Sequence, residues 1–228
     1  MNVKINSQIL VDELSCILFK YKNPNDAYLM EKYMRHNFKF LGIKKPIRTH
    51  VTKQWKTNVV KLHTLCIPEL VLHMWENDER EFQYVAMDLM SDFINVAPIS
   101  FINDIERLIV SKSWWDTVDL LASKISGRYF QLYPSKMYSI TNKWCMSENI
   151  WLNRASLLFQ LKYKETADLE LLHKYFIHLS HSNDFFVQKA IGWILREYSK
   201  TNTAFVRQII NSIDLKPLSI REASKYLQ

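Results

Sequence analysis

The stretches "IWLNRASLLFQL" (150–161) and "FFVQKAIGWILR" (185–196) lie in register, and this internal repeat decides the fold. In both, an aromatic, an apolar, an amide, a cationic residue and an alanine follow one another, so Ala155 and Ala190 are 35 residues apart. The stretch "EFQYVAMDLM" shares only the aromatic residue and the alanine, and its Ala86 precedes Ala155 by 69 residues, close to twice that period. A period of this size, with two helices per unit and no tetratricopeptide or ankyrin consensus, predicts a HEAT-like helical repeat solenoid. Such stacks curve, and their concave face usually binds an extended ligand.

The rest of the chain also predicts an all-α fold. Apolar residues recur at three- and four-residue spacing nearly everywhere, and the 228 residues include only three glycines and six prolines, whereas sheets need many turn residues. We expect about a dozen helices in a single domain over residues 1–228. Helix starts are expected at Pro24, Pro46, Pro68, Pro134 and Pro217, N-caps at Asn183 and Asp184, and a C-cap at Gly42.

Composition narrows the classes of function. Lys plus Arg exceed Asp plus Glu by 30 − 23 = 7, which suggests a polyanionic partner, although such a balance alone also serves solubility. The three cysteines are widely spaced, so neither a disulfide framework nor a zinc site is indicated. The chain has no phosphate-binding glycine loop, dinucleotide fingerprint, Gly-x-Ser-x-Gly or His-Glu-x-x-His motif, and we expect no cofactor and no metal. With no signal peptide or membrane span in the sequence, a soluble cytoplasmic monomer is expected.

The sequence "SKSWWDTVDLL" (111–121) carries the most specific candidate chemistry. On a helix, Trp115 and Asp119 lie one turn apart on the same face, while Trp114, Val118 and Leu121 lie on another. The simpler interpretation places both tryptophans in the core and the aspartates in solvent. Asp119 fits that interpretation poorly, because it is followed by two leucines. Its carboxylate therefore either reaches a groove or is buried and must find a partner.

Cations on the repeated helices form a second candidate feature. Arg154 and Lys162 belong to the first repeat stretch and its continuation, and Lys189 and Arg196 to the second. Each alone is most simply a solvated charge, but together they suggest a basic stripe for a phosphate backbone. Gly192, inside the second stretch, indicates either close helix packing or a groove-facing Trp193.

Five stretches resemble a known family: "YMRHNFKFLGIKKPIR" (33–48), "LIVSKSWWDTVDLLA" (108–122), "NIWLNRASLLFQLKYK" (149–164), "FFVQKAIGWILREYSKTN" (185–202) and "LSIREASKYL" (218–227). From about residue 24 to the end, the chain is similar to the DNA alkylation repair family of AlkD-type DNA glycosylases. The resemblance implies HEAT-like repeats that grip duplex DNA in a basic concave groove. It also implies hydrolysis of the N-glycosidic bond of cationic alkylated purines, such as N3-methyladenine and N7-methylguanine, in base excision repair without a cofactor.

The resemblance also implies roles for individual residues. Trp115, Trp193 and Asp119 match the catalytic set, and Tyr33 and Arg154 match groove residues close to the DNA. Before Pro46, this chain has Lys44 and Lys45 where relatives often carry uncharged residues, which should strengthen phosphate contact. The chief alternative is a catalytically inactive helical-repeat DNA-binding protein, which would not need Asp119. A protein-interaction scaffold, which would need neither the aspartate nor the basic stripe, is the weaker alternative.

Overall fold

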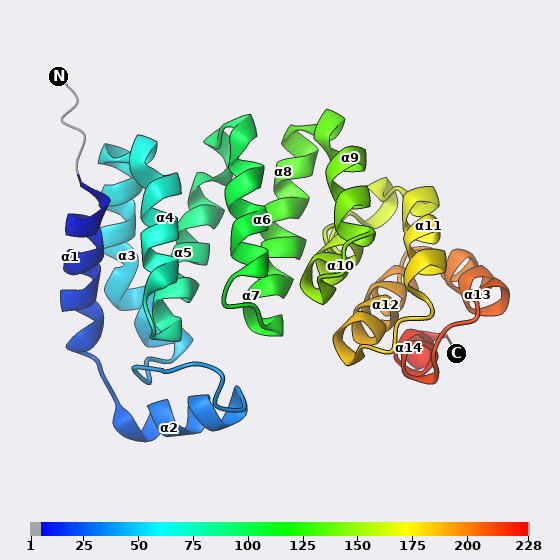
Figure 1. Ribbon diagram of the computed structural model, residues 1–228, viewed down its shortest axis with the longest axis horizontal. Coiled ribbons are helices and arrows are strands. Elements are labelled where there is room, and N and C mark those ends of the chain that lie inside the picture. Colours follow the sequence, from blue (N-terminus) through cyan, green and yellow to red (C-terminus); the bar gives the residue numbers. More distant parts are fainter. Residues whose placement is uncertain (1–5, 228) are drawn as a thin grey trace. The chain divides into compact units, whose positions relative to one another are not determined.

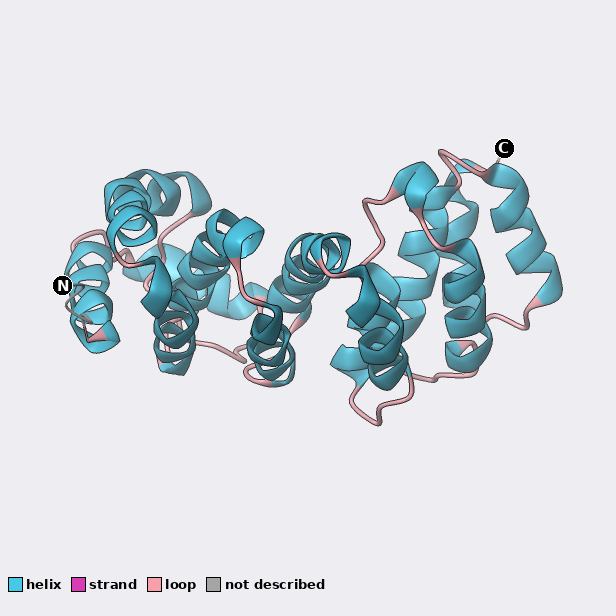
Figure 2. Cartoon of the chain, turned by 90° about the horizontal axis from the view of Figure 1, so that it is seen from above, coloured by secondary structure: helices cyan, strands magenta, loops and turns pink. Residues whose placement is uncertain are grey.

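The computed structural model describes residues 6–227, and within that range every regular element is helical (Figures 1 and 2). An isolated bridge joins Lys39 to Glu79. None of the helices in this range is long and apolar enough to cross a membrane. The predicted all-α fold is therefore confirmed. The α-helices are α1 (Ser7–Phe19), α2 (Pro24–Tyr33), α3 (Lys45–Leu62), α4 (Ile67–Glu76), α5 (Arg80–Phe93), α6 (Ile102–Val110), α7 (Trp115–Leu120), α8 (Gly127–Leu132), α9 (Pro134–Cys145), α10 (Ile150–Leu158), α11 (Leu169–Leu179), α12 (Phe185–Tyr198), α13 (Thr203–Ser212) and α14 (Pro217–Ala223).

Most of the expected helix boundaries are correct. Five helices carry proline in their first two positions, where a missing N–H costs nothing: α2, α3, α4, α9 and α14. Of the two expected N-caps, Asp184 and not Asn183 is the N-cap of α12, and its carboxylate accepts hydrogen bonds from the backbone N–H groups of Phe186 and Val187.

The expectation that Gly42 is a helix C-cap is wrong. Gly42 lies in the segment between α2 and α3, well after the end of α2. Its φ is +84°, and a Cβ there would stand 2.1 Å from the carbonyl oxygen of Asn23 and 2.6 Å from the backbone nitrogen of Ala27. Glycine is therefore needed for the positive φ and for the close approach of this segment to the first turn of α2.

The chain divides into two compact units, of which the first ends at Asp104. Within it, α1 contacts α3 and α4, and α5 contacts the same two helices. In Figure 1, α2 runs across the lower ends of these helices. The fully buried Glu81 of α5 accepts hydrogen bonds from the backbone N–H groups of Leu41, Gly42 and Ile43, at 2.9 to 3.0 Å. This carboxylate fixes the segment that leads into the start of α3.

The second unit begins at Ile105 and is organised around α10. This helix contacts α7, α9, α11 and α12, and α12 in turn contacts α13 and α14. A π-helical segment, η4 (Leu121–Ser126), joins α7 to α8. Helical repeat arrays divide readily into such units, because each repeat contacts only its neighbours. A single domain over the whole chain stays a prediction.

The amide in the repeat pattern has a structural role. In the second unit, the Asn153 side chain donates to the carbonyl oxygens of Trp144, Cys145 and Ser147 at 2.8 to 3.1 Å, which satisfies the C-terminal end of α9. Gln188 donates to the Ser182 carbonyl at 3.1 Å in the same way, just after α11. The repeated amide therefore ties the start of one helix to the end of the helix before it.

Candidate active site

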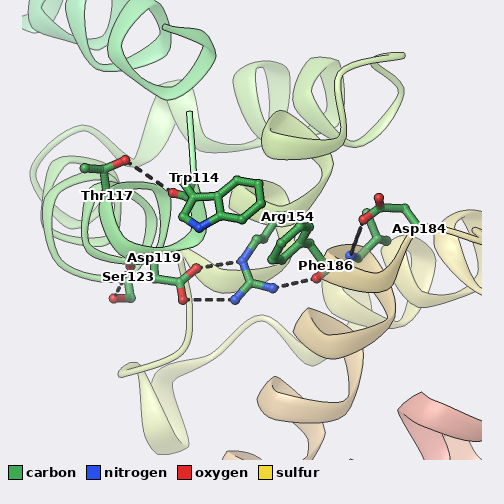
Figure 3. A network of polar contacts seen from close by, with 8 residues as sticks. Trp114, Thr117, Asp119, Ser123, Arg154, Asp184 and Phe186 are labelled. Atoms are coloured by element: carbon green, nitrogen blue, oxygen red, sulfur yellow. Dashed lines mark hydrogen bonds and ion pairs between the residues drawn. The ribbon is translucent and has the colours of Figure 1, made fainter. Parts of the chain in front are cut away.

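The Asp119 carboxylate and the Arg154 guanidinium form a bidentate ion pair in the second unit (Figure 3). Arg154 Nε lies 2.6 Å from Asp119 Oδ1, and Arg154 Nη2 lies 2.9 Å from Oδ2. The third guanidinium nitrogen, Nη1, donates to the carbonyl oxygen of Phe186 at 2.5 Å. Three elements thus meet through one arginine: α7, α10 and the first turn of α12. The sequence left open whether the Asp119 carboxylate reaches a groove or is buried with a partner. In the structure it has a partner, Arg154.

The two members of the pair differ in exposure. The side chain of Asp119 is 17% exposed, whereas that of Arg154 is 5% exposed. Burial raises the pKa of the Asp119 carboxyl, and the hydrogen bonds and charge of Arg154 oppose that rise. Because a guanidinium keeps its proton and its fork matches both carboxylate oxygens, the geometry is that of an ionised carboxylate. The site therefore presents an oriented carboxylate that still reaches solvent.

Two partly exposed tryptophans lie on the helices that form this site, Trp115 on the helix of Asp119 and Trp193 close to Arg154. Trp115 is the first residue of α7 and precedes Asp119 by one helical turn. Trp193 lies on α12, where its ring centroid is 6.0 Å from Cζ of Arg154. Both residues are intermediate in exposure. The structure thus brings Asp119, Trp193 and Arg154 together, with Trp115 on the same helical face as the carboxylate.

Trp114 belongs to the packing of the site. It is the N-cap of α7, with extended backbone, so the helix begins at Trp115, the second residue of the Trp-Trp pair. Its ring centroid lies 5.0 Å from that of Phe186 and 5.8 Å from that of Trp151. Within the described part of the chain, its buried indole N–H has no acceptor. This aromatic cluster supports Phe186, whose carbonyl oxygen holds Arg154.

The π-helical segment η4 begins two residues after Asp119, a feature that nothing in the sequence indicated. Ser126 donates its hydroxyl to the Leu121 carbonyl at 2.9 Å, and Ser123 donates to the carbonyl of Asp119 at 2.6 Å. Short π-helical insertions are rare and occur frequently at functional sites, because the wider turn redirects side chains. Here the wider turn directly follows the residue that carries the carboxylate.

The predicted basic stripe needs a correction at Arg154, and two of its other cations share an acidic partner that the sequence did not indicate. Arg154 is not a cation on an open face, because it is buried and all three of its nitrogens donate within the protein. Lys189 and Arg196 of α12 both bind the carboxylate of Glu222, at 2.9 and 3.0 Å. Lys162 is exposed in the turn after α10. Contact of these residues with DNA stays a prediction.

The remaining predicted site residues belong to the first unit. Tyr33 at the end of α2 is 69% exposed, and Lys44 forms an ion pair of 2.7 Å with Asp26. Tyr33 and Lys44 line one hollow of about 240 Å³, together with residues that include Asp26 and Tyr84. Lys45 and Pro46 are exposed in the first turn of α3.

Two residues of this region, Glu222 and Lys225, were not predicted from the sequence. Their spacing is a local signal, since acidic and basic residues three positions apart on a helix are neighbours, and in the structure they form an ion pair of 2.7 Å. The carboxylate's contacts with Lys189 and Arg196 had no local signal, because they join α14 to α12.

The fold and the site together define a class of protein: an all-helical protein of consecutively packed helices that presents an arginine-bound carboxylate beside tryptophan side chains. The chain belongs to the DNA alkylation repair enzyme family, whose model matches residues 17–227. A solved structure described as "Predicted DNA alkylation repair enzyme from Enterococcus faecalis" is 35% identical in sequence and superimposes with a TM-score of 0.85. The match covers 90% of this chain and 96% of that one. No curated protein matches the sequence.

Proposed function

We propose that this protein is a DNA glycosylase that hydrolyses the N-glycosidic bond of cationic alkylated purines, such as N3-methyladenine and N7-methylguanine, in duplex DNA. The observation that carries the proposal is the partly exposed Asp119 carboxylate, oriented by Arg154 and with tryptophan side chains nearby. Membership of a DNA alkylation repair family supports the substrate class.

The chemistry of an alkylated purine explains why one carboxylate suffices. Such a base already carries positive charge and leaves as a neutral molecule, so the protonating acid of ordinary glycosidases is unnecessary. As the bond lengthens, positive charge develops on the deoxyribose. Asp119 would stabilise this oxocarbenium ion, and the π faces of Trp115 and Trp193 would favour the same charge.

The ion pair with Arg154 leaves Asp119 able to act on water. An ionised carboxylate offers about four lone-pair positions, and Arg154 occupies two of them. The remaining positions can accept a hydrogen bond from the water that attacks the sugar, while the guanidinium fixes the direction of both oxygens. Arg154 is thus proposed as a positioning residue for the carboxylate, in addition to its predicted place near the DNA.

A catalytically inactive DNA-binding protein is the second candidate, and one observation favours it. Because Arg154 neutralises Asp119, this carboxylate would repel a phosphate backbone only weakly. A binding protein could therefore keep the aspartate as part of its core. Only an assay of bond cleavage separates the two candidates.

The test is a single-turnover comparison on one duplex that carries either N7-methylguanine or uracil at the same position. We expect release of free N7-methylguanine and little or no release of uracil, which departs as an anion unless it is protonated. The N7-methylguanine duplex incubated without protein is the control for spontaneous depurination. Comparable release of both bases would refute the mechanism, and binding of the N7-methylguanine duplex without release would favour the inactive binding protein.

A further inference from the structure

One buried carboxylate gathers three cations at the C-terminal end of the second unit. Glu222 Oε1 accepts from Lys189 Nζ at 2.9 Å, and Oε2 accepts from Arg196 Nη1 at 3.0 Å and from Lys225 Nζ at 2.7 Å. Lys189 and Arg196 come from α12, and Lys225 follows α14 in the 3₁₀ turn η6 (Ser224–Tyr226). We name these four residues the Glu222 cluster.

The carboxylate is held rigidly by close packing of the two helices. The side chain of Glu222 is only 7% exposed. A Cβ on Gly192 would lie 2.5 Å from Cβ of Glu222 and 2.9 Å from the Ser219 carbonyl oxygen, so only glycine lets α14 approach α12 this closely. Gly192 immediately precedes Trp193. The cluster is therefore anchored next to a proposed catalytic side chain.

The cations of the cluster remain available to a further anion. Three cations on one carboxylate leave a net charge of +2. The side chains of Lys189, Arg196 and Lys225 are 36%, 26% and 47% exposed, although their common partner is buried. Each cation gives Glu222 a single N–H, whereas a lysine has three and an arginine five. Several donors are thus held close together at a partly exposed surface.

We infer that Glu222 is a positioning residue that presents Lys189, Arg196 and Lys225 as one binding site for the phosphates of a DNA backbone beside Trp193, which makes Lys225 a further DNA-binding residue. This inference rests on the proposed function, because the ligand is the backbone of the same duplex. Long cationic side chains lose much conformational entropy when they bind a phosphate singly. Because the shared carboxylate already restrains the three side chains, less conformational entropy is left to be lost when the DNA binds.

The direction in which one substitution changes the affinity for DNA separates positioning of the cations from simple charge neutralisation. If Glu222 only weakened the attraction for DNA, Glu222→Gln would raise the affinity, since the cluster would gain one positive charge. If Glu222 positions the cations, the same substitution lowers the affinity and reduces the slope of log affinity against log salt by about 0.9 to 1.8, one to two phosphate contacts. Binding to an undamaged duplex, measured by fluorescence anisotropy between 50 and 200 mM salt, shows this direction.

Lys225→Ala is the second variant, and it leaves the packing of α12 against α14 intact. We expect it to reduce the magnitude of the slope of log affinity against log salt by about 0.9. The loss of affinity over a fourfold increase in salt would then be about 3.5-fold smaller than in the parent protein. Lys174→Ala is the matched control, because it removes one exposed lysine paired with the exposed Glu170 on α11. An equal effect of the two alanine substitutions would overturn the inference.

The two proposals fail in different ways. If the parent protein binds duplex DNA and releases N7-methylguanine while Lys225→Ala keeps the parent salt slope, the inference about the Glu222 cluster is overturned alone. If the parent protein does not bind duplex DNA, the proposed function is overturned and the inference with it. Reduced slopes in both variants, with the control unchanged, support the inference. Should Glu222→Gln not fold, as judged by circular dichroism, Lys225→Ala alone decides.

Discussion

Replacing Asp119 by asparagine tests the proposed chemistry most directly. A carboxylate about 4 Å from a developing sugar cation contributes about 4 kcal/mol at the effective dielectric constant of about 20 that suits a partly exposed site. Arg154, bound to both oxygens, offsets part of that attraction. We therefore expect the rate of base release to fall by about 10² to 10³, the range measured when one preorganised stabiliser is removed.

The ion pair adds a cost to the same substitution. Asparagine can accept one hydrogen bond from Arg154, but its amide NH₂ would face the other guanidinium donor. Because the arginine side chain is only 5% exposed, losing its counter-charge should also lower the stability of the fold. The assay is therefore single-turnover release of N7-methylguanine with enzyme in excess, at a temperature below the thermal unfolding midpoints of both proteins.

Asp116→Asn is the matched control for this experiment. It removes the same charge from the same helix, and Asp116 itself raises the pKa of Asp119. We expect near-parent rates for the control. The reasoning is refuted if Asp119→Asn releases N7-methylguanine at the parent rate, or if both variants lose activity equally.

Three further predictions follow from contacts of the second unit. Arg154→Ala should move the acidic limb of the pH–rate profile to higher pH, since Arg154 lowers the pKa of a carboxyl that must be ionised; an unmoved limb would contradict the positioning role. Gly192→Ala should destabilise the fold by about 1 to 3 kcal/mol in urea denaturation, because its Cβ would meet Glu222 and Ser219; higher stability would mean that helix propensity outweighs the packing. Hydrogen bonds from Lys225 and Lys189 lower the pKa of Glu222 from 4.5 to about 2, so its stabilisation is full above pH 4.5 and is lost as the pH falls towards 2. The deficit in unfolding temperature of Glu222→Gln should therefore be largest at pH 7 and shrink between pH 4.5 and 3; a deficit independent of pH would rule out the charge as its cause.

Much of the fold could be predicted because its determinants are local. Proline at a helix start and aspartate at an N-cap act within one turn, and the sequence shows them directly. The expectation for Gly42 is wrong because its determinant is not local: the positive φ and the close approach to Asn23 require glycine, and a carboxylate of α5 holds the same segment through its backbone N–H groups.

The amide positions mark the repeat more accurately than the alanine positions do. Gln83 donates to the carbonyl oxygens of Met74, Trp75 and Asn77 at 2.8 to 3.4 Å, and so does for α4 what Asn153 does for α9. Gln83 precedes Asn153 by 70 residues, twice the period of 35, whereas the alanine alignment gives 69. The hydrogen-bonding amide is the better marker of the repeat, because its contact with the preceding helix constrains its position more strictly than burial constrains a small side chain.

The same period explains why the partner of Asp119 is Arg154. Asp119, Arg154 and Lys189 follow one another at intervals of 35 residues, and Arg154 lies next to Asp119 because equivalent positions of consecutive repeats are neighbours. The predicted basic stripe includes the two later residues, whereas the earlier aspartate was considered only with Trp115. In the structure, Arg154 pairs with Asp119 before it, and Lys189 pairs with Glu222 after it. These four positions carry two cations and two carboxylates, so they contribute no net attraction for DNA. Any surplus charge near Trp193 must come from residues outside that spacing, namely Arg196 and Lys225, which is why the attraction for a phosphate backbone is expected at the Glu222 cluster rather than at Arg154.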